Sequence, residues 1–344
     1  MKVDCIAALW IVLSATAVVV LTLCVLCTGS VPLSVGDVWA ALTGRVPQTP
    51  TIDADLAHFV VWETRLPEAL VAILSGAALA VSGLIMQTLF RNPLADPSLL
   101  GVGAGAAVGA AVAILVFGGA LFMAVGSTLC VVVAAMTGAT LVVVLLTLVA
   151  RRVNDNASLL IIGVMLSLFA GAIVTLLNYH AAADGVRQFV LWGMGDFSSV
   201  GLPLLPLYAC CLLPPLLLLP CCAKGLDALL LGHDYAATLG VNVGRLRPLL
   251  LLAAGWLTAV TTALCGPIAF VGLAVPHLAR ALVGSGLHRV LLPLTMLLGS
   301  VVCLLCQLVC SASLLPFALP LNALTPLIGA PVVIGLMLRC KAQA

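Results

Sequence analysis

Cysteine, histidine and lysine are the residues of this sequence that metal, redox or phosphate chemistry would use. The 13 cysteines include a Cys-X-X-Cys pair, Cys24 and Cys27, and a helically spaced group, Cys303, Cys306 and Cys310. Neither group has a histidine or carboxylate beside it, as a metal site would need. Most of the cysteines lie in apolar runs, where a thiol packs as a small hydrophobic side chain. We therefore interpret them as packing residues and expect no metal or cofactor in this chain.

ATP binding by a P-loop is excluded. That motif needs a Gly-Lys pair, because backbone N–H groups surround the phosphates while the lysine reaches the β- and γ-oxygens. None of the three lysines, Lys2, Lys224 and Lys341, follows a glycine. The chain is therefore not expected to be an enzyme, and any ATP and Mg²⁺ would be bound by a separate partner chain.

The composition indicates helices that cross a membrane. Of the 344 residues, 63% are hydrophobic and 8% are charged, whereas a soluble domain carries roughly 25% charged residues. Such a chain cannot cover a globular surface with side chains that water solvates. The net charge of +2 is too small for a nucleic-acid-binding surface. We expect an all-α protein with several spans, in contact with the lipid bilayer and without a nucleic-acid partner.

Uncharged runs of about 20 residues mark the spans. They cover residues 6–27, 69–89, 157–183 and 197–223, with two spans each in 98–150 and 290–338. A cleaved signal peptide would have an apolar part of about 7–15 residues, and the first run is longer, so we favour an uncleaved first helix. Residues 29–64 are the most polar stretch and are predicted to form an extramembrane loop.

The distribution of basic residues decides how often residues 248–279 cross. This segment is long for one span and short for two, and basic clusters flank it on both sides. All clusters face the cytoplasm, as the positive-inside rule requires, only if the segment crosses twice and turns at Gly266 and Pro267. The result is a single domain over residues 1–344 with about ten helices and both termini cytoplasmic. Residues 29–64 then lie outside and residues 224–247 inside.

Three glycines of the predicted third span recur at helical spacing. Gly101, Gly105 and Gly109 stand four residues apart, and small residues at that spacing allow two helix backbones to approach closely. We interpret them as packing residues between helices.

An ion-coupled carrier usually places carboxylates or histidines within its spans. Here the acids fall in predicted loops or at helix ends. We interpret His180 and His277, the histidines nearest to the spans, as structural, with Pro276 and His277 breaking a helix. If the chain transports a solute, it would need a motor from another protein.

The longest predicted inner stretch could receive such a motor. Residues 226–231 and 235–239 predict two short helices, separated by Gly232 and ended by Gly240. A folded inner loop is a suitable docking surface, although a simple surface hairpin would give the same pattern.

Several strings in the chain together resemble one family. They are Arg-Leu-Pro at 65–67, Asn-Pro-Leu-Ala-Asp-Pro at 92–97, Leu-Gly-Val at 239–241 and Gly-Pro-Ile-Ala-Phe-Val-Gly-Leu at 266–273. In this order they are similar to the permease subunits of type II ABC importers for iron-siderophores, haem and vitamin B12, the FecCD-like permeases. The resemblance covers nearly the whole chain.

The resemblance implies a ten-helix permease in the bacterial cytoplasmic (inner) membrane. It also implies a homodimer, two cytoplasmic ATPase subunits and an extracytoplasmic substrate-binding protein. The positions that match the ATPase-coupling helices are Leu226, Leu231, Gly232, Asp234, Ala236, Leu239, Gly240 and Val241. Those that match the cytoplasmic gate are Asn92, Pro93, Leu94, Asn156 and Ala157.

Docking of the binding protein is the feature in which this chain departs from its family. Arg65 matches an outer arginine that pairs with a glutamate of the binding protein, and we expect its guanidinium to be exposed. Glu68 stands where many relatives have a second arginine, and relatives often carry charged residues where this chain has Gln307, Ser311 and Ala318. We expect the partner's docking surface to be less acidic than usual or to rely on apolar contact.

The expected function is that of a permease subunit of an ATP-driven importer. Its cargo would be an iron chelate, with haem or a ferric siderophore ranked ahead of cobalamin, and it would work by alternating access. The alternative is an ion-coupled secondary transporter that acts without an ATPase.

Overall fold

The computed structural model describes residues 2–45, 49, 53–98, 100–118, 127–153, 155–311 and 319–342, and these residues form helices without any strand. Seven helical runs of this part of the chain are long and apolar enough to span a membrane. They are α1 (Lys2–Cys27), α3–η1–α4 (Ala54–Phe59, Val60–Arg65, Leu66–Phe90), α7 (Ser127–Ala150), α8 (Asn156–His180), α10–η3–α11 (Leu205–Leu218, Leu219–Cys222, Ala223–Leu230), α13 (Val243–Cys265) and α15 (His288–Ser311).

Three shorter apolar helices fill the remaining places among the ten expected spans. They are α5 with η2 (Val102–Ala111, Val112–Val116), α14 (Val271–Val283) and α16 (Leu321–Ala342). The predicted turn at Gly266 and Pro267 is confirmed, because α13 ends at Cys265 and α14 begins at Val271. At about 1.5 Å per residue, α14 is too short to cross a bilayer core of about 30 Å by itself.

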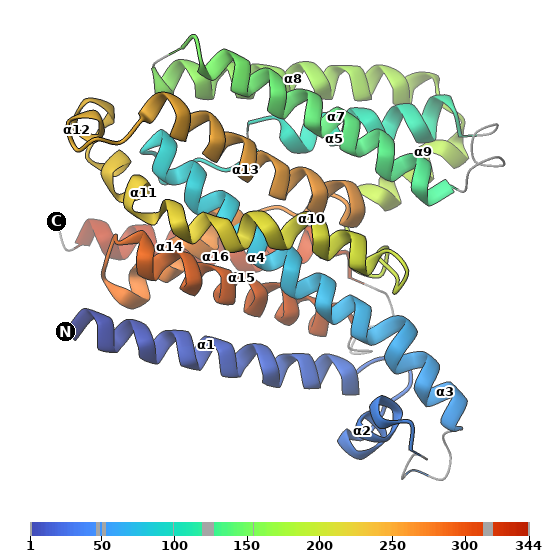
Figure 1. The fold of residues 1–344 in the computed structure, drawn as a ribbon. Helices are drawn as coiled ribbons and strands as arrows, with labels where there is room; N and C mark the ends of the chain where they lie inside the picture. Colours follow the sequence, from blue (N-terminus) through green and yellow to red (C-terminus); the bar gives the residue numbers. More distant parts are fainter. Residues whose placement is uncertain are drawn as a thin grey trace.

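The two ends of the bundle carry different elements (Figure 1). Both termini lie at the end that also holds α11 and α12 (His233–Thr238), whereas α2 (Val35–Thr43) and α3 lie at the opposite end with α9 (Ala183–Gly193). The predicted segment 224–247 therefore lies on the same side as both termini. Its last residues already belong to α13.

Residues 54–64 of the predicted extramembrane segment 29–64 do not form an irregular loop. These residues are helical and continue into α4 without a break. Ala57 and Val61 are buried on one face, while Asp55 and Glu63 are exposed on the other. The charges that indicated a loop thus lie on the solvent side of an amphipathic helix.

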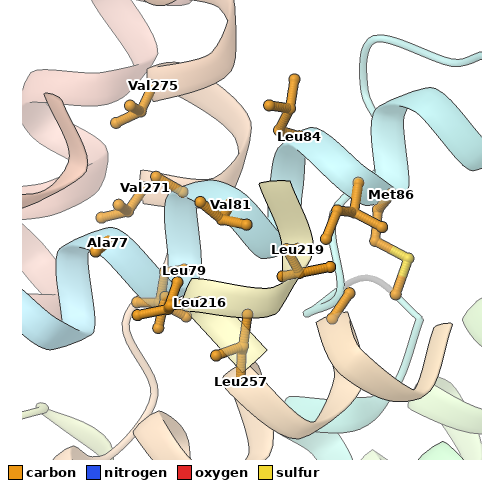
Figure 2. Close-up of a cluster of buried hydrophobic side chains, with 14 of the residues drawn as sticks. Ala77, Leu79, Val81, Leu84, Met86, Leu216, Leu219, Leu257, Val271 and Val275 are labelled. Atoms are coloured by element: carbon orange, nitrogen blue, oxygen red, sulfur yellow. The ribbon is translucent and has the colours of Figure 1, made fainter. Parts of the chain in front are cut away.

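Helix α4 runs through the middle of the bundle, and 20 of its 25 residues are buried. Figure 2 shows Leu79, Val81 and Leu84 of α4 within a cluster to which α10, η3, α13 and α14 also contribute. Lipid tails are as apolar as leucine, so close contact, rather than removal from water, stabilises this packing.

Glycines make the closest crossings of α4 possible. A side chain at Gly76 would overlap the backbone of Gly299 in α15, and one at Gly83 would overlap the carbonyl of Gly272 in α14. Two of the three glycines predicted to pack between helices, Gly105 and Gly109, also allow a close helix crossing. Gly105 and Gly109 lie against the backbone of α7, whereas Gly101 precedes α5 and lies beside α8 with a φ of +90°.

The expected helix break at Pro276 and His277 is wrong, because α14 continues through both residues. Proline has no N–H and leaves the carbonyl four residues earlier without its helical partner. That carbonyl belongs to Gly272, and Gln87 of α4 donates a hydrogen bond to it at 3.4 Å and to Leu273 O at 3.2 Å. A neighbouring side chain thus takes the place of the missing donor.

Replacing Gly83 with alanine is expected to destabilise the bundle, because the new methyl group would overlap Gly272. Overpacking of this kind costs about 1–3 kcal/mol, which corresponds to a fall in melting temperature of roughly 2–10 °C. Gly103→Ala is the matched control, since no atom lies within 4 Å of a methyl group placed there. Thermal unfolding of the detergent-solubilised variants measures the difference, and equal melting temperatures would contradict the assignment.

Candidate functional site

The candidate site lies at the end of the bundle that carries both termini. It consists of the coupling segment, residues 224–247, and the gate loop, which is the end of α4 with residues 91–94 and the start of α8 at 155–157. Residues of three separate parts of the chain thus meet in one place.

The coupling segment has one buried face and one exposed face. Leu226 and Ala236 are fully buried, and Val241 is half-buried. Leu231, Tyr235 and Leu239, here called the apolar stripe, are about 60% exposed; Leu231 follows α11, Tyr235 lies in α12 and Leu239 follows α12. Asp234 and Gly240 are exposed as well. The segment therefore presents an apolar stripe with an acidic neighbour to its surroundings.

Two glycines give this segment its shape. Gly232 has a φ of +116° and separates α11 from α12, and Gly240 has a φ of +81° and follows α12. Residues with a Cβ rarely adopt these angles, and glycine adopts them without strain. The two short helices and their glycine boundaries agree with the sequence prediction.

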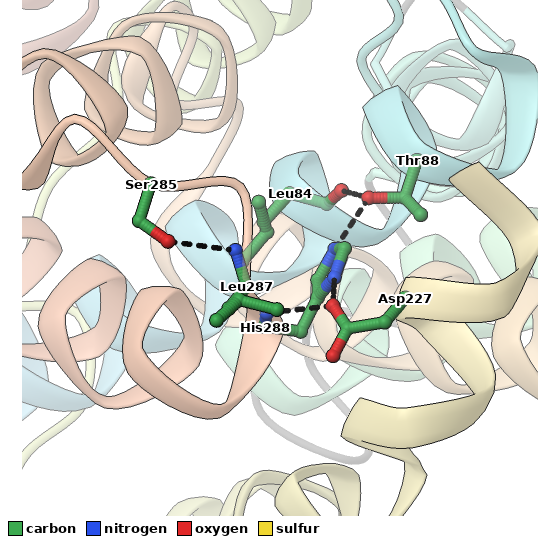
Figure 3. Close-up of polar contacts among 6 residues, drawn as sticks. All are labelled: Leu84, Thr88, Asp227, Ser285, Leu287 and His288. Atoms are coloured by element: carbon green, nitrogen blue, oxygen red, sulfur yellow. Dashed lines mark hydrogen bonds and ion pairs between the residues drawn. The ribbon is translucent and has the colours of Figure 1, made fainter. Parts of the chain in front are cut away.

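A hydrogen-bonded chain joins the coupling segment to the end of α4 (Figure 3). Asp227 of α11 accepts hydrogen bonds from the backbone N–H of His288 at 2.8 Å and from its Nδ1 at 2.7 Å. The Nε2 atom of His288 lies 2.8 Å from Oγ1 of Thr88, in the last turn of α4. An ionised carboxylate only accepts, so Nδ1 carries the proton toward Asp227. His288 is 1% exposed and holds both partners in place.

A second chain reaches the same turn of α4 from α13. Arg247 is 5% exposed and donates to Val153 O and to Asn156 Oδ1, both at 3.0 Å. The amide of Asn156 in turn donates to Leu89 O at 2.9 Å. Carbonyls in the last turn of a helix lack intrahelical donors, and Asn156 supplies a donor for the carbonyl of Leu89.

The gate loop surrounds a cavity of about 560 Å³. Asn92, Asn156 and Ala157 line it together with Asp155. Helix α4 ends at Arg91, which has a φ of +48°, and Asn92 Oδ1 then accepts from the N–H of Leu94 at 2.9 Å. Of the five expected gate residues, the cavity thus brings three together, while Pro93 and Leu94 lie beside it in the same turn.

Asp155 fixes the start of α8 next to this cavity. Its carboxylate accepts hydrogen bonds from the N–H groups of Ala157 and Ser158, and from the Ser158 hydroxyl. The bonds from Ser158 hold the pKa of Asp155 below its ordinary value. A carboxylate at a helix N-terminus also interacts favourably with the helix dipole.

Arg65 does not present the exposed guanidinium that the sequence led us to expect. The side chain is 6% exposed, and Nη1 donates to Leu26 O at 2.7 Å while Nη2 donates to Val31 O. Leu26 lies in the last turn of α1, where carbonyls need outside donors. Arg65 therefore holds the chain that leaves α1.

Three of the positions expected to depart from the family pattern lie together at the end of the bundle that carries α2 and α3. Gln307 Nε2 donates to Glu68 Oε2 at 2.8 Å and lies 3.1 Å from Ser311 Oγ. Ala318 lies outside the described residues. Glu68, Gln307 and Ser311 thus form one hydrogen-bonded group.

Sequence reasoning missed Asp227, His288, Thr88 and Arg247. A weak signal was present, because Asp227 is the acid among the leucines of a short amphipathic helix and His288 stands at the start of a span. Their partners are 61 and 200 residues apart in the chain, so spacing alone could not join them.

The fold and this site define a polytopic helical membrane protein. At the end of its bundle that carries both termini, a folded segment is joined by hydrogen bonds to the last turn of α4. The sequence profile of the FecCD transport family matches residues 17–339, and the chain belongs to this family. The family resemblance predicted from the sequence is therefore confirmed.

Relatives and a solved structure agree over most of their lengths. The vitamin B12 import system permease protein BtuC of Serratia proteamaculans is 40% identical over 311 residues, which cover 90% of this chain and 89% of the relative. BtuC of Salmonella typhi is 38% identical over 331 residues, covering 96% and 95%. A structure described as a metal-chelate type ABC transporter in an inward-facing conformation superposes with a TM-score of 0.82 at 32% identity, covering 96% of this chain and 98% of that one. The predicted permease fold is thus confirmed.

Replacing Asp227 with asparagine is expected to destabilise the chain. Asparagine keeps the shape but loses the carboxylate that His288 faces, and an impaired buried partner costs about 1–3 kcal/mol. Thermal unfolding in detergent measures the loss, with Asp55→Asn on the exposed face of α3 as control. A melting temperature of Asp227→Asn equal to that of the control would show that the chain of hydrogen bonds contributes nothing.

Proposed function

We propose that the chain is the transmembrane permease subunit of an ABC importer for a metal chelate. The observation that carries this proposal is the combination of FecCD family membership with a folded segment hydrogen-bonded to the gate loop. The chain lacks a P-loop, so ATP and Mg²⁺ are bound by a partner ATPase and ATP is not hydrolysed by this chain.

The apolar stripe of the coupling segment is the proposed docking surface for the ATPase. Leu231, Tyr235 and Leu239 lie exposed at the end of the bundle where the termini are. Apolar and aromatic side chains of this kind form the centre of protein interfaces. This end faces the cytoplasm in the proposed topology, and the opposite end faces the binding protein.

Alternating access follows from the two hydrogen-bonded chains. When ATP binding moves the coupling segment, Asp227 and Arg247 move with it. His288 passes the displacement of Asp227 to Thr88, and Asn156 passes that of Arg247 to Leu89. Both chains act on the last turn of α4, which leads into the gate loop. Two discrete arrangements of such a packed network would correspond to a closed and an open gate.

The proposed assembly contains a second copy of this chain, two ATPase subunits and an extracytoplasmic binding protein, in a bacterial inner membrane. Family membership supports each partner. The ion-coupled alternative is not retained, because the family match extends over nearly the whole chain.

The cargo is proposed to be a metal chelate of the size of haem, a ferric siderophore or cobalamin. The expectation from the sequence ranked the iron chelates ahead of cobalamin. The vitamin B12 names of the relatives at 38–40% identity favour cobalamin, so cobalamin is the first compound to test.

Uptake by the reconstituted importer tests this function. The chain is co-expressed with its proposed partner ATPase and binding protein and reconstituted into proteoliposomes. The expected result is ATP-dependent uptake of one of labelled cobalamin, haem or ferric siderophore. Uptake that continues without any ATPase, or failure of the ATPase to co-purify with the chain, would overturn the proposal.

Replacing Gly240 with valine is expected to uncouple ATP hydrolysis from uptake. A β-branched residue at a φ of +81° costs about 1–3 kcal/mol in backbone strain, which would reorient the end of α12. Nothing lies within 4 Å of a methyl group at this position, so strain is the only obstacle. The control is Gly286→Val, which also meets open space but at an ordinary φ. The ratio of cargo imported to ATP hydrolysed should fall at least severalfold for Gly240→Val alone, and an unchanged ratio would remove the coupling role of this turn.

A further inference from the structure

Two hollows adjoin along α13, and neither belongs to the gate. The first, here called the basic pocket, has a volume of about 850 Å³ and lies among the ends of α7, α12 and α13. The second, here called the apolar groove, has a volume of about 400 Å³ and lies among α7, α10 and α13. Leu249 and Leu252 line both hollows, so the two lie side by side.

The basic pocket carries an excess of positive charge. Its lining includes Arg151, Arg245 and Arg247, with Asp234 as the acid among them. Arg247 is buried in the bonds to the gate loop described above. Arg151, directly after α7, and Arg245, in the first turn of α13, are both exposed. Guanidinium groups bind phosphate oxygens with paired N–H donors.

The apolar groove is open at the surface and lies among helices that are long and apolar enough to span a membrane. Leu218 is 65% exposed and Leu249 is 54% exposed. Thr140, Ala253 and Ala259 leave space between them. Leu249, Leu252 and Trp256 lie on one face of α13, as their spacing requires. The groove therefore presents an apolar trough on the lipid side of three helices.

A side-chain hydrogen bond that replaces a missing backbone bond joins two of the helices that line this groove. Pro215 interrupts α10 and cannot donate to the carbonyl of Cys211. The indole Nε1 of Trp256 donates to that carbonyl at 3.0 Å. In hydrocarbon an unpaired carbonyl would be costly, so this bond ties α10 to α13 and holds the Trp256 ring in the groove.

The length of the combined hollow matches one leaflet of a bilayer. Trp256 is eleven positions after Arg245 in α13. At about 1.5 Å per residue this corresponds to about 16 Å along the helix. Half of a hydrocarbon core of about 30 Å is nearly the same length. A molecule with a phosphate at Arg245 would reach the bilayer midplane near Trp256.

We propose that the basic pocket and the apolar groove together bind one anionic glycerophospholipid. The phosphate lies between Arg151 and Arg245, and an acyl chain lies along Leu249, Leu252 and Trp256. A free phosphate would leave the groove empty, and a docked protein would have to enter the hydrocarbon to fill it. A lipid in this position contacts Asp234 and Ala237 of α12, which line the basic pocket, so it rests directly against the coupling segment. This inference does not depend on what the chain transports.

Lipid retention by the purified full-length chain tests the proposal. The chain in detergent is titrated with dioleoyl-phosphatidylglycerol or dioleoyl-phosphatidylcholine, and bound lipid is counted by native mass spectrometry. We expect one phosphatidylglycerol molecule to bind at least tenfold more tightly than phosphatidylcholine. Saturating inorganic phosphate should not displace it, because phosphate cannot occupy the groove. Equal retention of the two lipids, or displacement by phosphate, would overturn the proposal.

Variants of each half of the site provide the controls. Each of Arg151→Gln and Arg245→Gln should weaken phosphatidylglycerol binding roughly fivefold (about 1 kcal/mol). Arg152→Gln removes the same charge one residue outside the pocket and should have no effect. Ala253→Trp fills the groove and should abolish binding with both arginines intact, whereas Leu217→Trp, outside the groove, should not. If the Arg151 and Arg245 variants lose ATPase binding but retain the lipid, the pocket is a protein interface and the proposal is wrong.

Discussion

In a bilayer every backbone polar group must find its partner within the protein, and this constraint explains most of the polar side chains in the bundle. Three carbonyls without helical donors are each reached by a side chain from another helix. Gln87 serves the carbonyl freed by Pro276, Trp256 serves the one freed by Pro215, and Arg65 serves the end of α1. Because an unpaired carbonyl is costly where water is absent, each of these side-chain donors stabilises the helix whose carbonyl it reaches. Pro276 and Pro215 are thus each compensated by a polar side chain of a neighbouring helix.

The same constraint links local structure to movement at the candidate site. The last turn of α4 needs outside partners, and it takes them from α8 and α15, which are themselves bonded to α13 and α11. A helix end that sits in water would be solvated instead and would move independently. Buried between polar partners, it follows the elements that bond it. The hydrogen bonds that complete the helix thus also join it to the coupling segment.

Periodicity and charge predicted what depends on local sequence. Uncharged runs located the spans, Gly266 and Pro267 located a turn, and Gly232 and Gly240 bounded two short helices, because each of these depends on residues close together in the chain. Contacts between distant residues could not be predicted in this way. The burial of Arg65 depends on where the carbonyl of Leu26 lies, and the contact of His288 with Thr88 joins residues 200 positions apart. Helix α9 was missed because its charges and its position between spans indicated a loop.

The distribution of polar groups along α4 suggests how the parts of the chain divide the work. Its middle is packed by glycine against neighbouring backbones, with no polar side chain free to bind cargo tightly, while polar networks lie at its two ends. A packed interior of this kind transmits a displacement, because it repacks between discrete arrangements and does not deform continuously. Weak contact with the cargo is consistent with transport, since a pathway that binds tightly releases slowly. In the proposed assembly, selection of the cargo falls to the binding protein and the timing of release to the ATPase.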